Sequence, residues 1–169
     1  MSAPFRIEAL IAEHDRSTFD CGSEPLNRYF RQQVTQDARR RVTACFVAVE
    51  QSRGVLAGYY SVASSSVPLT DLPEAMAKKL PRYPFVPAVR MGRLVVDQQF
   101  KGEGLGAAML ADALARSVKA EIAAYALVVD AKDAQAAAFY RHHGFLAFND
   151  DQLALFLPLA TAREFLKRR

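Results

Sequence analysis

The chain has 169 residues, of which 51% are hydrophobic and 24% are charged, and its formal net charge is +4. This balance excludes disordered, collagen-like and coiled-coil proteins, and we expect residues 1–169 to form a single domain. The longest apolar run, Ile122 to Val129, is far shorter than the roughly 18 residues that a membrane span needs. The N-terminal residues show no secretory signal. We therefore expect a cytoplasmic protein that does not contact membranes.

The potential metal ligands show no recognised spacing. Cys21 and Cys45 are far apart in the sequence and do not form a CxxC pair. The three histidines do not form an HExxH motif. We expect no metal site and two reduced cysteines.

The first half of the chain predicts a strand, an amphipathic helix and an antiparallel hairpin, followed by an irregular excursion. Apolar residues at spacings of three and four indicate the helix, which begins at Ser23 to Pro25 and ends near the arginine run 39–41. Five prolines characterise the excursion, which has one short helical piece at 74–80. The expected strands are 5–11, 43–50 and 55–66, and the excursion covers 67–88.

The second half alternates strands and helices and closes with a strand pair. Asp133 is expected to cap one of these helices, and Gly144 to end it. The order of elements favours an α/β fold, a mixed sheet with helices on its faces. The expected strands are 89–96, 123–130, 145–148 and 153–157, and the expected helices are 104–119 and 134–142.

A glycine-rich turn follows the strand that ends at Val96 and opens the next helix. Gly102, Gly104 and Gly106 lack the Cβ atoms that would hold a ligand away from the backbone. The start of a helix presents unpaired N–H groups and a positive dipole end, which suits a pyrophosphate. Lys101 adds a mobile cation at the rim. The spacing matches neither a P-loop nor a Rossmann fingerprint, and the alternative is a turn that serves packing only.

Two segments together resemble the motifs of the GNAT family of N-acetyltransferases. Lys-Gly-Glu-Gly-Leu-Gly at 101–106 resembles motif A, whose pattern is Gln/Arg-x-x-Gly-x-Gly/Ala. The segment 130–145 resembles motif B, in which an Asn opens a helix that ends in Phe/Leu-Tyr-x-x-x-Gly-Phe. The two motifs stand in the family's order, and the resemblance covers most of the chain.

The resemblance implies one mixed, mostly antiparallel sheet with a central splay between the strands that end at Val96 and Asp130, and helices on both faces. Acetyl-CoA would lie in the splay as co-substrate, without a metal. Lys101 replaces Gln or Arg but still donates to phosphate. Asp133 replaces the usual Asn, which leaves its capping role but not a side-chain donation to CoA. The implied acetyl-CoA residues are Leu94, Val95, Val96, Lys101, Gly102, Glu103, Gly104, Leu105, Gly106, Ala107, Asp133 and Phe139.

Tyr140 is the expected general acid for the departing thiolate. A phenol with a reference pKa near 10 keeps its proton at neutral pH. The alternative is that Tyr140 is a core aromatic of its helix, a role that Phe139 fits better. No Asp or Glu stands out as a general base.

Four shorter stretches narrow the resemblance to the acetyltransferase toxins of bacterial toxin–antitoxin pairs. They are 19–30, 58–63, 79–84 and 92–97. This resemblance implies acetylation of the α-amino group of aminoacyl-tRNA and a block of translation. It also implies a ribbon-helix-helix antitoxin as partner and a homodimer.

The basic residues have two interpretations. On the toxin interpretation they follow the phosphates of the tRNA acceptor stem, and on the alternative they form a solvated face. Arg93 could equally pair with Asp97 or another acid. The candidate tRNA-binding residues are Arg28, Arg39, Arg40, Arg41, Lys78, Lys79 and Arg93.

Two rival functions stay open. One is a GNAT enzyme for a small-molecule, peptide or protein amine, although few acids near the splay argue against a polyamine. The other is a non-catalytic acetyl-CoA-binding regulator or nucleic-acid-binding module. Retention of Tyr140 and of all three glycines argues against the second rival.

Overall fold

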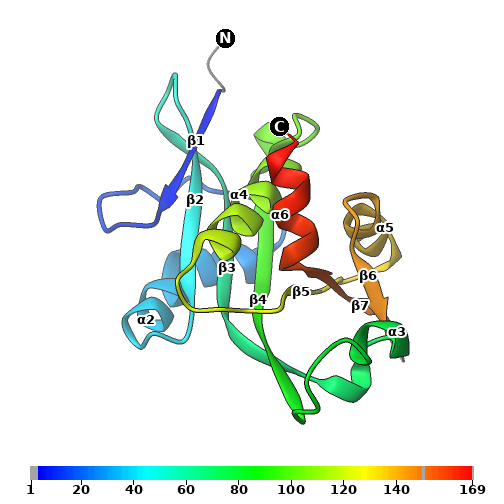
Figure 1. Ribbon diagram of the computed structural model, residues 1–169. Helices are drawn as coiled ribbons and strands as arrows, with labels where there is room; N and C mark the ends of the chain where they lie inside the picture. Colours follow the sequence, from blue (N-terminus) through cyan, green and yellow to red (C-terminus); the bar gives the residue numbers. More distant parts are fainter. Residues whose placement is uncertain (1–3, 150, 169) are drawn as a thin grey trace. The chain divides into compact units, whose positions relative to one another are not determined.

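A computed structural model describes residues 4–149 and 151–168 of the chain. The elements match the mixed α/β fold expected from the sequence (Figure 1). One seven-stranded sheet has the order β1-β2-β3-β4-β5-β7-β6. The strands are β1 (Phe5–Ala9), β2 (Ala44–Glu50), β3 (Val55–Pro68), β4 (Phe85–Val96), β5 (Ala126–Asp130), β6 (Leu146–Phe148) and β7 (Asp151–Pro158).

The helical segments include three single turns and one π-helix. They are α1 (Glu24–Arg28), the π-helix η1 (Tyr29–Gln33), α2 (Val34–Arg39), η2 (Leu69–Asp71), α3 (Glu74–Ala77), η3 (Gln98–Phe100), α4 (Leu105–Lys119), α5 (Ala134–His142) and α6 (Leu159–Lys167). In the part of the chain that the structure describes, no helix is long and apolar enough to cross a membrane.

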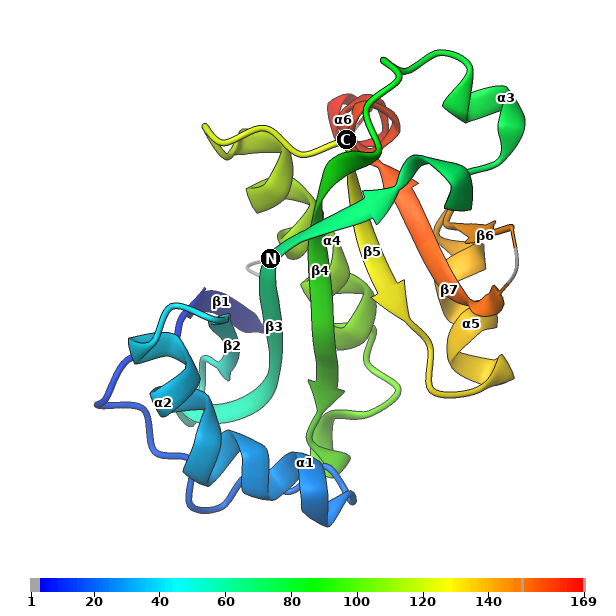
Figure 2. The ribbon, with the colours of Figure 1, turned by 90° about the horizontal axis from the view of Figure 1, so that it is seen from below.

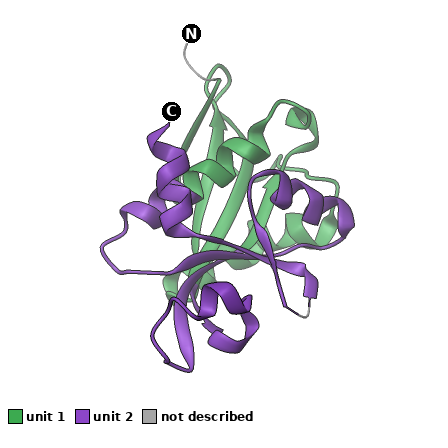
Figure 3. Ribbon diagram, turned by 45° about the vertical axis from the view of Figure 1, so that its right-hand side comes forward, with its two compact units in different colours: residues 1–63, 92–113 green, residues 64–91, 114–169 purple. Residues whose placement is uncertain are grey.

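The chain divides into two compact units, coloured separately in Figure 3. Unit 1 comprises residues 1–63 and 92–113, and unit 2 comprises residues 64–91 and 114–169. Strands β3 and β4 and helix α4 contribute residues to both units. The boundaries between the two units therefore fall within these three elements.

Unit 1 has an aromatic core between β3 and the segment α1–η1–α2. Figure 2 shows this helical segment beside the strand. Phe30 and Tyr59 stack with ring centroids 4.2 Å apart, and Phe19 packs edge-on against Phe30. All three side chains are almost completely buried. The Tyr59 hydroxyl donates to the Leu26 carbonyl at 3.0 Å, which satisfies the polar end of this buried ring.

Helices lie on both faces of the unit 1 strands, as expected. Successive residues of a strand point to opposite faces. Tyr59 packs on the α1–η1–α2 segment, whereas the Tyr60 hydroxyl donates to Asp112 of α4 at 2.6 Å. A Cβ on Gly58 would come within 2.8 Å of the Met109 side chain of α4. Glycine at position 58 therefore allows α4 to approach β3 closely.

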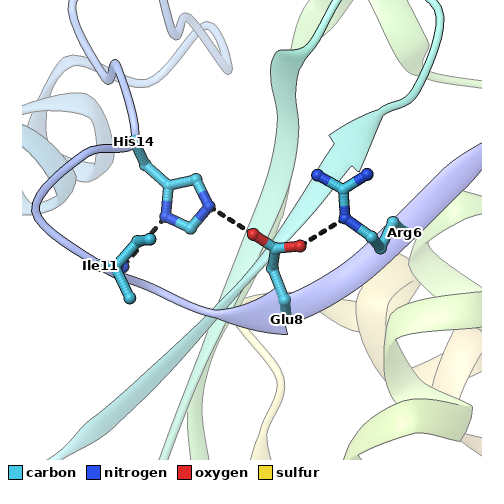
Figure 4. A network of polar contacts seen from close by, with 4 residues as sticks. All are labelled: Arg6, Glu8, Ile11 and His14. Carbon is cyan, nitrogen blue, oxygen red and sulfur yellow. Dashed lines mark hydrogen bonds and ion pairs between the residues drawn. The ribbon is translucent and has the colours of Figure 1, made fainter.

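The N-terminal strand is anchored by a small polar network (Figure 4). Glu8 accepts hydrogen bonds from Arg6 and from the His14 ring, at 2.5 and 2.7 Å. The Ile11 N–H donates to His14 Nδ1 at 3.0 Å, so the proton of the neutral ring lies on Nε2, toward Glu8. These bonds hold the turn that follows β1.

Unit 2 contains the parallel strand pair of the sheet. Residues Ala88–Met91 of β4 pair in parallel with Ala126–Val129 of β5, and β5 then pairs antiparallel with β7. Its core includes Val67, Val86, Val128 and Phe156. The parallel register ends at Met91, and the rest of β4 belongs to unit 1. The splay expected between β4 and β5 stays a prediction.

Several predicted boundaries were wrong. Helix α6, which begins directly after Pro158, was not predicted. Strand β4 begins at Phe85, inside the stretch expected to be irregular, and β5 begins only at Ala126. The helix expected from Ser23 onward is interrupted by the π-helix η1, whose hydrogen bond joins the Val34 N–H to the Tyr29 carbonyl.

Candidate active site

The glycine-rich turn in unit 1 leaves its backbone open to a ligand. Gly102 and Gly104 have φ angles of +82° and +80°, a region that favours glycine. A Cβ at either position would meet no atom within 4 Å, so the conformation and not crowding requires glycine. The exposed turn leads into α4, where the Ala108 N–H donates to the Gly104 carbonyl at 3.1 Å. The preceding N–H groups of this first turn have no acceptor within the helix, an arrangement that suits an anion.

Lys101 is not the mobile cation expected from the sequence. Its Nζ donates to the Cys21 carbonyl at 3.1 Å, which fixes the side chain against the turn before α1. The bond leaves the positive charge in place beside the glycines. Lys101 therefore joins two segments that are 80 residues apart and keeps a fixed cation at the turn.

Asp97 organises the end of β4, a role that the sequence analysis missed. This buried carboxylate accepts the N–H groups of Asp20 and Gln99, each at 2.9 Å. Asp20 in turn accepts from the buried Asn27 amide at 3.0 Å, which, with the Gly22 N–H, lowers the pKa of Asp20. The turn 19–22 is thereby held against the strand end that leads to the glycines. An Asp directly after a strand was the available signal.

The strand residues that precede this turn alternate in burial. Val95 is buried in the unit 1 core, whereas Leu94 and Val96 are half-buried. The Asp97 N–H donates to the Ala57 carbonyl at 2.8 Å, which closes this end of β4 onto β3. The side chain of Val95 therefore serves the core, and only its backbone is available for a ligand.

Tyr140 combines a buried ring with a hydroxyl that has no partner among the described residues. Its side chain in unit 2 is 8% exposed and packs on Phe145 at 5.4 Å. In the described part of the chain, the one fully buried side-chain oxygen or nitrogen without a partner is Ser61 Oγ, so the Tyr140 hydroxyl reaches the surface. Burial raises the pKa of Tyr140 to about 12, which keeps the phenol protonated at neutral pH.

The other two residues of the second motif have distinct environments. Asp133 caps α5, because its Oδ1 accepts the Ala136 N–H at 2.8 Å, which confirms the expected cap. Phe139 is half-buried and lies against His143. Its ring is therefore more exposed than that of Tyr140, the reverse of the packing roles expected from the sequence.

The expected tRNA-binding residues fall into three surroundings. Arg28, Lys79 and the run Arg39–Arg41 are exposed, and exposed Lys78 pairs with Glu74 at 3.4 Å. Arg93 is half-buried and lies over the Tyr29 ring, 3.4 Å from its centroid. Arg93 does not pair with Asp97, since that carboxylate accepts backbone N–H groups. The two lysines belong to unit 2 and the arginines to unit 1.

A cavity of about 190 Å³ lies in unit 2. Three aspartates line it, Asp71, Asp130 and Asp151, and Arg90 forms an ion pair with Asp130. The sequence analysis expected few acids near the splay and did not predict this group of carboxylates. No metal-binding cluster of His, Cys, Asp or Glu occurs among the residues that the structure describes.

Residues 19–158 match the family described as acetyltransferase (GNAT) domain. The chain belongs to the GNAT acetyltransferase family. It is therefore an enzyme of the N-acetyltransferase class. The matched range includes the glycine-rich turn, the end of β4 and Tyr140.

GNAT proteins similar to this chain include toxins. A Mycobacterium tuberculosis protein named tRNA-acetylating toxin is 34% identical over 98% of this chain and 96% of its own length. The structure of AtaT complexed with acetyl-methionyl-tRNA superposes with a TM-score of 0.88 at 28% identity, over 96% of this chain and 99% of that one. A mutant AtaT bound to the C-terminus of its antitoxin AtaR and acetyl-CoA gives 0.78 at 25% identity, over 96% and 98%.

Proposed function

We propose that this GNAT enzyme transfers the acetyl group of acetyl-CoA to the α-amino group of aminoacyl-tRNA and thereby acts as a cytoplasmic toxin that blocks translation. The similarity to the tRNA-acetylating toxin, which extends over nearly the whole of both chains, carries this proposal. The AtaT complex with acetyl-methionyl-tRNA supports it, because an acetylated aminoacyl-tRNA is the product of such a reaction. Residues 1–169 act in this proposal as a single acetyltransferase domain.

Acetyl-CoA binds in this proposal along unit 1. The pyrophosphate accepts N–H groups from the turn 101–107, where Gly102 and Gly104 leave the backbone open and Lys101 supplies a cation. The pantetheine arm pairs with the backbone of 94–96 as an added strand would. Glu103, Leu105, Asp133 and Phe139 complete the contacts by resemblance. Asp133 acts only as an acceptor and cap, because an ionised carboxylate has no proton to donate.

The chemical step forms a C–N bond and breaks the C–S bond of the thioester. The neutral amine attacks the carbonyl carbon, and the tetrahedral intermediate expels the CoA thiolate while the amine loses a proton. Tyr140 donates its hydroxyl proton to the departing sulfur, because its surface hydroxyl is free and its pKa is raised to about 12. An α-amino group titrates near 8, and its ester neighbour lowers this pKa, so the acceptor needs no strong general base.

Basic and aromatic side chains supply the tRNA contacts. The exposed run Arg39–Arg41, with Arg28, follows backbone phosphates, and Arg93 contributes from β4. In unit 2, Tyr83 and Phe85 are 66% and 55% exposed and lie close in sequence to Lys78 and Lys79. Exposed aromatic rings next to cations are the usual means of stacking unpaired RNA bases. The acceptor end of the tRNA has such unpaired bases.

The proposed partners are an antitoxin and a second copy of the chain. The mutant AtaT bound to its antitoxin supports a protein antitoxin here. We propose that this antitoxin is of the ribbon-helix-helix type and that the toxin is a homodimer, as the resemblance to toxin–antitoxin acetyltransferases implies. Size-exclusion chromatography with light scattering tests the dimer, and co-purification from a two-gene operon tests the antitoxin.

The deciding experiment measures transfer of labelled acetyl from acetyl-CoA to bulk tRNA, charged in one reaction and deacylated in the other. Label on charged tRNA alone, lost with Tyr140→Phe and kept with Tyr125→Phe, is the expected result. Tyr125 is the matched control because it lies in the same unit and burial also raises its pKa. Equal labelling of both samples, or none with acetyl-CoA bound, contradicts the proposal.

The unit 2 cavity favours a second candidate function, acetylation of a small cationic amine. Three carboxylates against one arginine would attract an ammonium group more strongly than a phosphate. A panel of polyamines, aminoglycosides and N-terminal peptides, assayed with the same labelled acetyl-CoA, tests this alternative. Turnover of one of these amines with no label on charged tRNA would establish it.

A further inference from the structure

Ser61 of β3 carries a buried hydroxyl that the rest of the described protein does not use. The residue is 1% exposed, and its Oγ has no hydrogen-bond partner among the described residues. Burying a hydroxyl without a partner destabilises the folded state. Alanine or valine would fill the same strand position without this cost. The hydroxyl therefore calls for a partner from outside the chain.

Gly92 of β4 lies next to Ser61 and marks the point at which such a partner could approach it. Gly92 itself is exposed, although the serine beside it is buried. A Cβ built on Gly92 would lie 3.3 Å from Ser61 Oγ, closer than ordinary van der Waals contact. Any other residue at position 92 would therefore cover the hydroxyl. Ser61 Oγ is closed to solvent in the free protein, so a ligand reaches it only if the backbone at Gly92 gives way, which the missing side chain makes easier.

The groups around Ser61 and Gly92 suit an uncharged ligand. Cys45 lies opposite Ser61 in the β2–β3 register, and burial raises the pKa of its thiol to about 12. Cys45 thus stays a neutral thiol and cannot act as a base or nucleophile at neutral pH. Arg93, the residue after Gly92, is turned onto the Tyr29 ring. Among these neighbours, Ser61 is the hydroxyl able to accept and donate a hydrogen bond.

The direction of the acetyl-CoA arm places the reacting end near Ser61, a step that rests on the proposed function. The pyrophosphate site at 101–107 follows β4, so a pantetheine arm paired with 94–96 runs backward along the strand. Its thioester therefore emerges on the Leu94 side, next to Gly92. Residues in a strand rise by about 3.3 Å each, so Gly92 lies within roughly 7 Å of Leu94 along the strand.

We propose that Ser61 is a positioning residue for the acceptor, whose amine donates one N–H to the Ser61 oxygen beneath Gly92. A neutral primary amine has two N–H bonds and one lone pair. Holding one N–H fixes the direction of the lone pair toward the thioester carbonyl and leaves the other hydrogen free. Ser61 takes no proton in this role, and the amine's proton leaves to solvent. The class of ligand is a primary amine presented at the end of a larger acceptor.

The test compares Ser61→Ala with Ser64→Ala, an exposed serine of the same strand. Steady-state kinetics with charged tRNA and acetyl-CoA, together with thermal unfolding of the free enzyme, are measured for each. We expect Ser61→Ala to lower kcat/KM for charged tRNA about tenfold, which corresponds to one hydrogen bond of about 1.4 kcal/mol. The KM for acetyl-CoA should stay at the wild-type value. The melting temperature should not fall. Ser64→Ala should match the wild type.

A second variant, Gly92→Ala, adds a methyl group 3.3 Å from Ser61 Oγ while it keeps the hydroxyl. The same loss in kcat/KM for charged tRNA, with unchanged acetyl-CoA affinity, is expected. A destabilised Ser61→Ala protein with wild-type kinetics would overturn the proposal, because Ser61 would then be a structural group. If the wild type acetylates a small amine and not charged tRNA, the proposed substrate fails. The comparison is then repeated with that amine, and unchanged kcat/KM for it overturns the Ser61 proposal separately.

Discussion

The guanidinium of Arg93 on β4 lies 3.4 Å from the centroid of the Tyr29 ring. Tyr29 is the first residue of the π-helical segment η1. The Tyr29 hydroxyl donates to Asp37 at 2.8 Å, so cation, ring and carboxylate form a chain across the unit 1 surface. Burial and this hydrogen bond raise the pKa of Tyr29 to about 12. π-Helical turns are frequent at functional sites, and here one sets the position of an aromatic ring under an arginine.

The contact between Arg93 and Tyr29 should contribute to the free energy of unfolding. Arg93→Ala and Tyr29→Leu each remove the contact, and a double-mutant cycle isolates it. We expect a coupling free energy of about 0.5–2 kcal/mol from urea unfolding. Arg93→Lys should keep the charge and lose most of the coupling, because an ammonium cannot stack as a planar guanidinium does. Additive effects of the two single variants would mean that the contact does not stabilise the fold.

Tyr140→Phe should leave the fold and acetyl-CoA binding intact and lower kcat by about 10²–10⁴-fold, the range for loss of a general acid. The pKa of Tyr140 near 12 means that the wild-type phenol keeps its proton throughout the neutral and mildly alkaline range. The kcat profile should therefore rise as the amine loses its proton and show no fall from Tyr140 ionisation below about pH 11. A kcat equal to wild type would make Tyr140 a packing residue.

Gly104→Asp should weaken acetyl-CoA binding more than tenfold, as measured by calorimetry, because it places a carboxylate at the proposed pyrophosphate site. Gly54→Asp is the matched control. Gly54 also has a positive φ, +70°, and open space around its Cβ position, but it lies in the β2–β3 turn. Both variants carry similar backbone strain. Equal acetyl-CoA affinities of the two would remove the phosphate role of the glycine-rich turn.

Arg41 occupies a position that favours glycine. It has a φ of +59° and follows Arg40, the C-cap of α2. The Val42 N–H donates to the Asp37 carbonyl at 3.0 Å, the pattern of a Schellman motif. Arg41→Gly should therefore raise the free energy of unfolding by about 1 kcal/mol. The same change should raise the KM for charged tRNA and reduce its salt dependence.

Arg40→Ala separates the two effects of the Arg41 change. It removes an equally exposed charge from a residue with ordinary helical backbone angles. We expect weaker tRNA binding without the gain in stability. An unchanged salt slope in both variants, and in a charge reversal of 39–41, would make the arginine run a solvated face.

Glu50 should make the β2–β3 turn sensitive to acid. Hydrogen bonds from the Ser52 hydroxyl and N–H, with those from Arg53, lower the pKa of Glu50 to about 2. A carboxyl with a lowered folded-state pKa stabilises the fold above its unfolded value near 4.5, and this stability is lost as pH falls toward 2. Urea unfolding at pH 6 and pH 3 should show a smaller acid loss for Glu50→Gln than for the wild type. Glu13→Gln, at an exposed site, should behave as the wild type.

The sequence by itself determined the features that depend on neighbouring residues. One continuous segment contains the end of β4, the glycines with positive φ at 102 and 104, and the start of α4. The Asp133 cap needs only the N–H group three residues later. Such local hydrogen bonds and backbone preferences are properties of the residues themselves. The family motifs could therefore be recognised, and with them the enzyme class.

Only the tertiary structure decided which distant residues meet. Lys101 was expected to be mobile, but the fold brings the Cys21 carbonyl, 80 residues away, within hydrogen-bond distance. Arg93 lies over an aromatic ring, whereas the sequence left a tRNA phosphate and an acid as its possible partners. Asp97 accepts a backbone N–H group of a distant segment. Ser61 of β3 lies next to Gly92 of the neighbouring strand β4, a contact that the sequence does not indicate. These contacts depend on strand order and register, which bring together side chains that no local pattern relates.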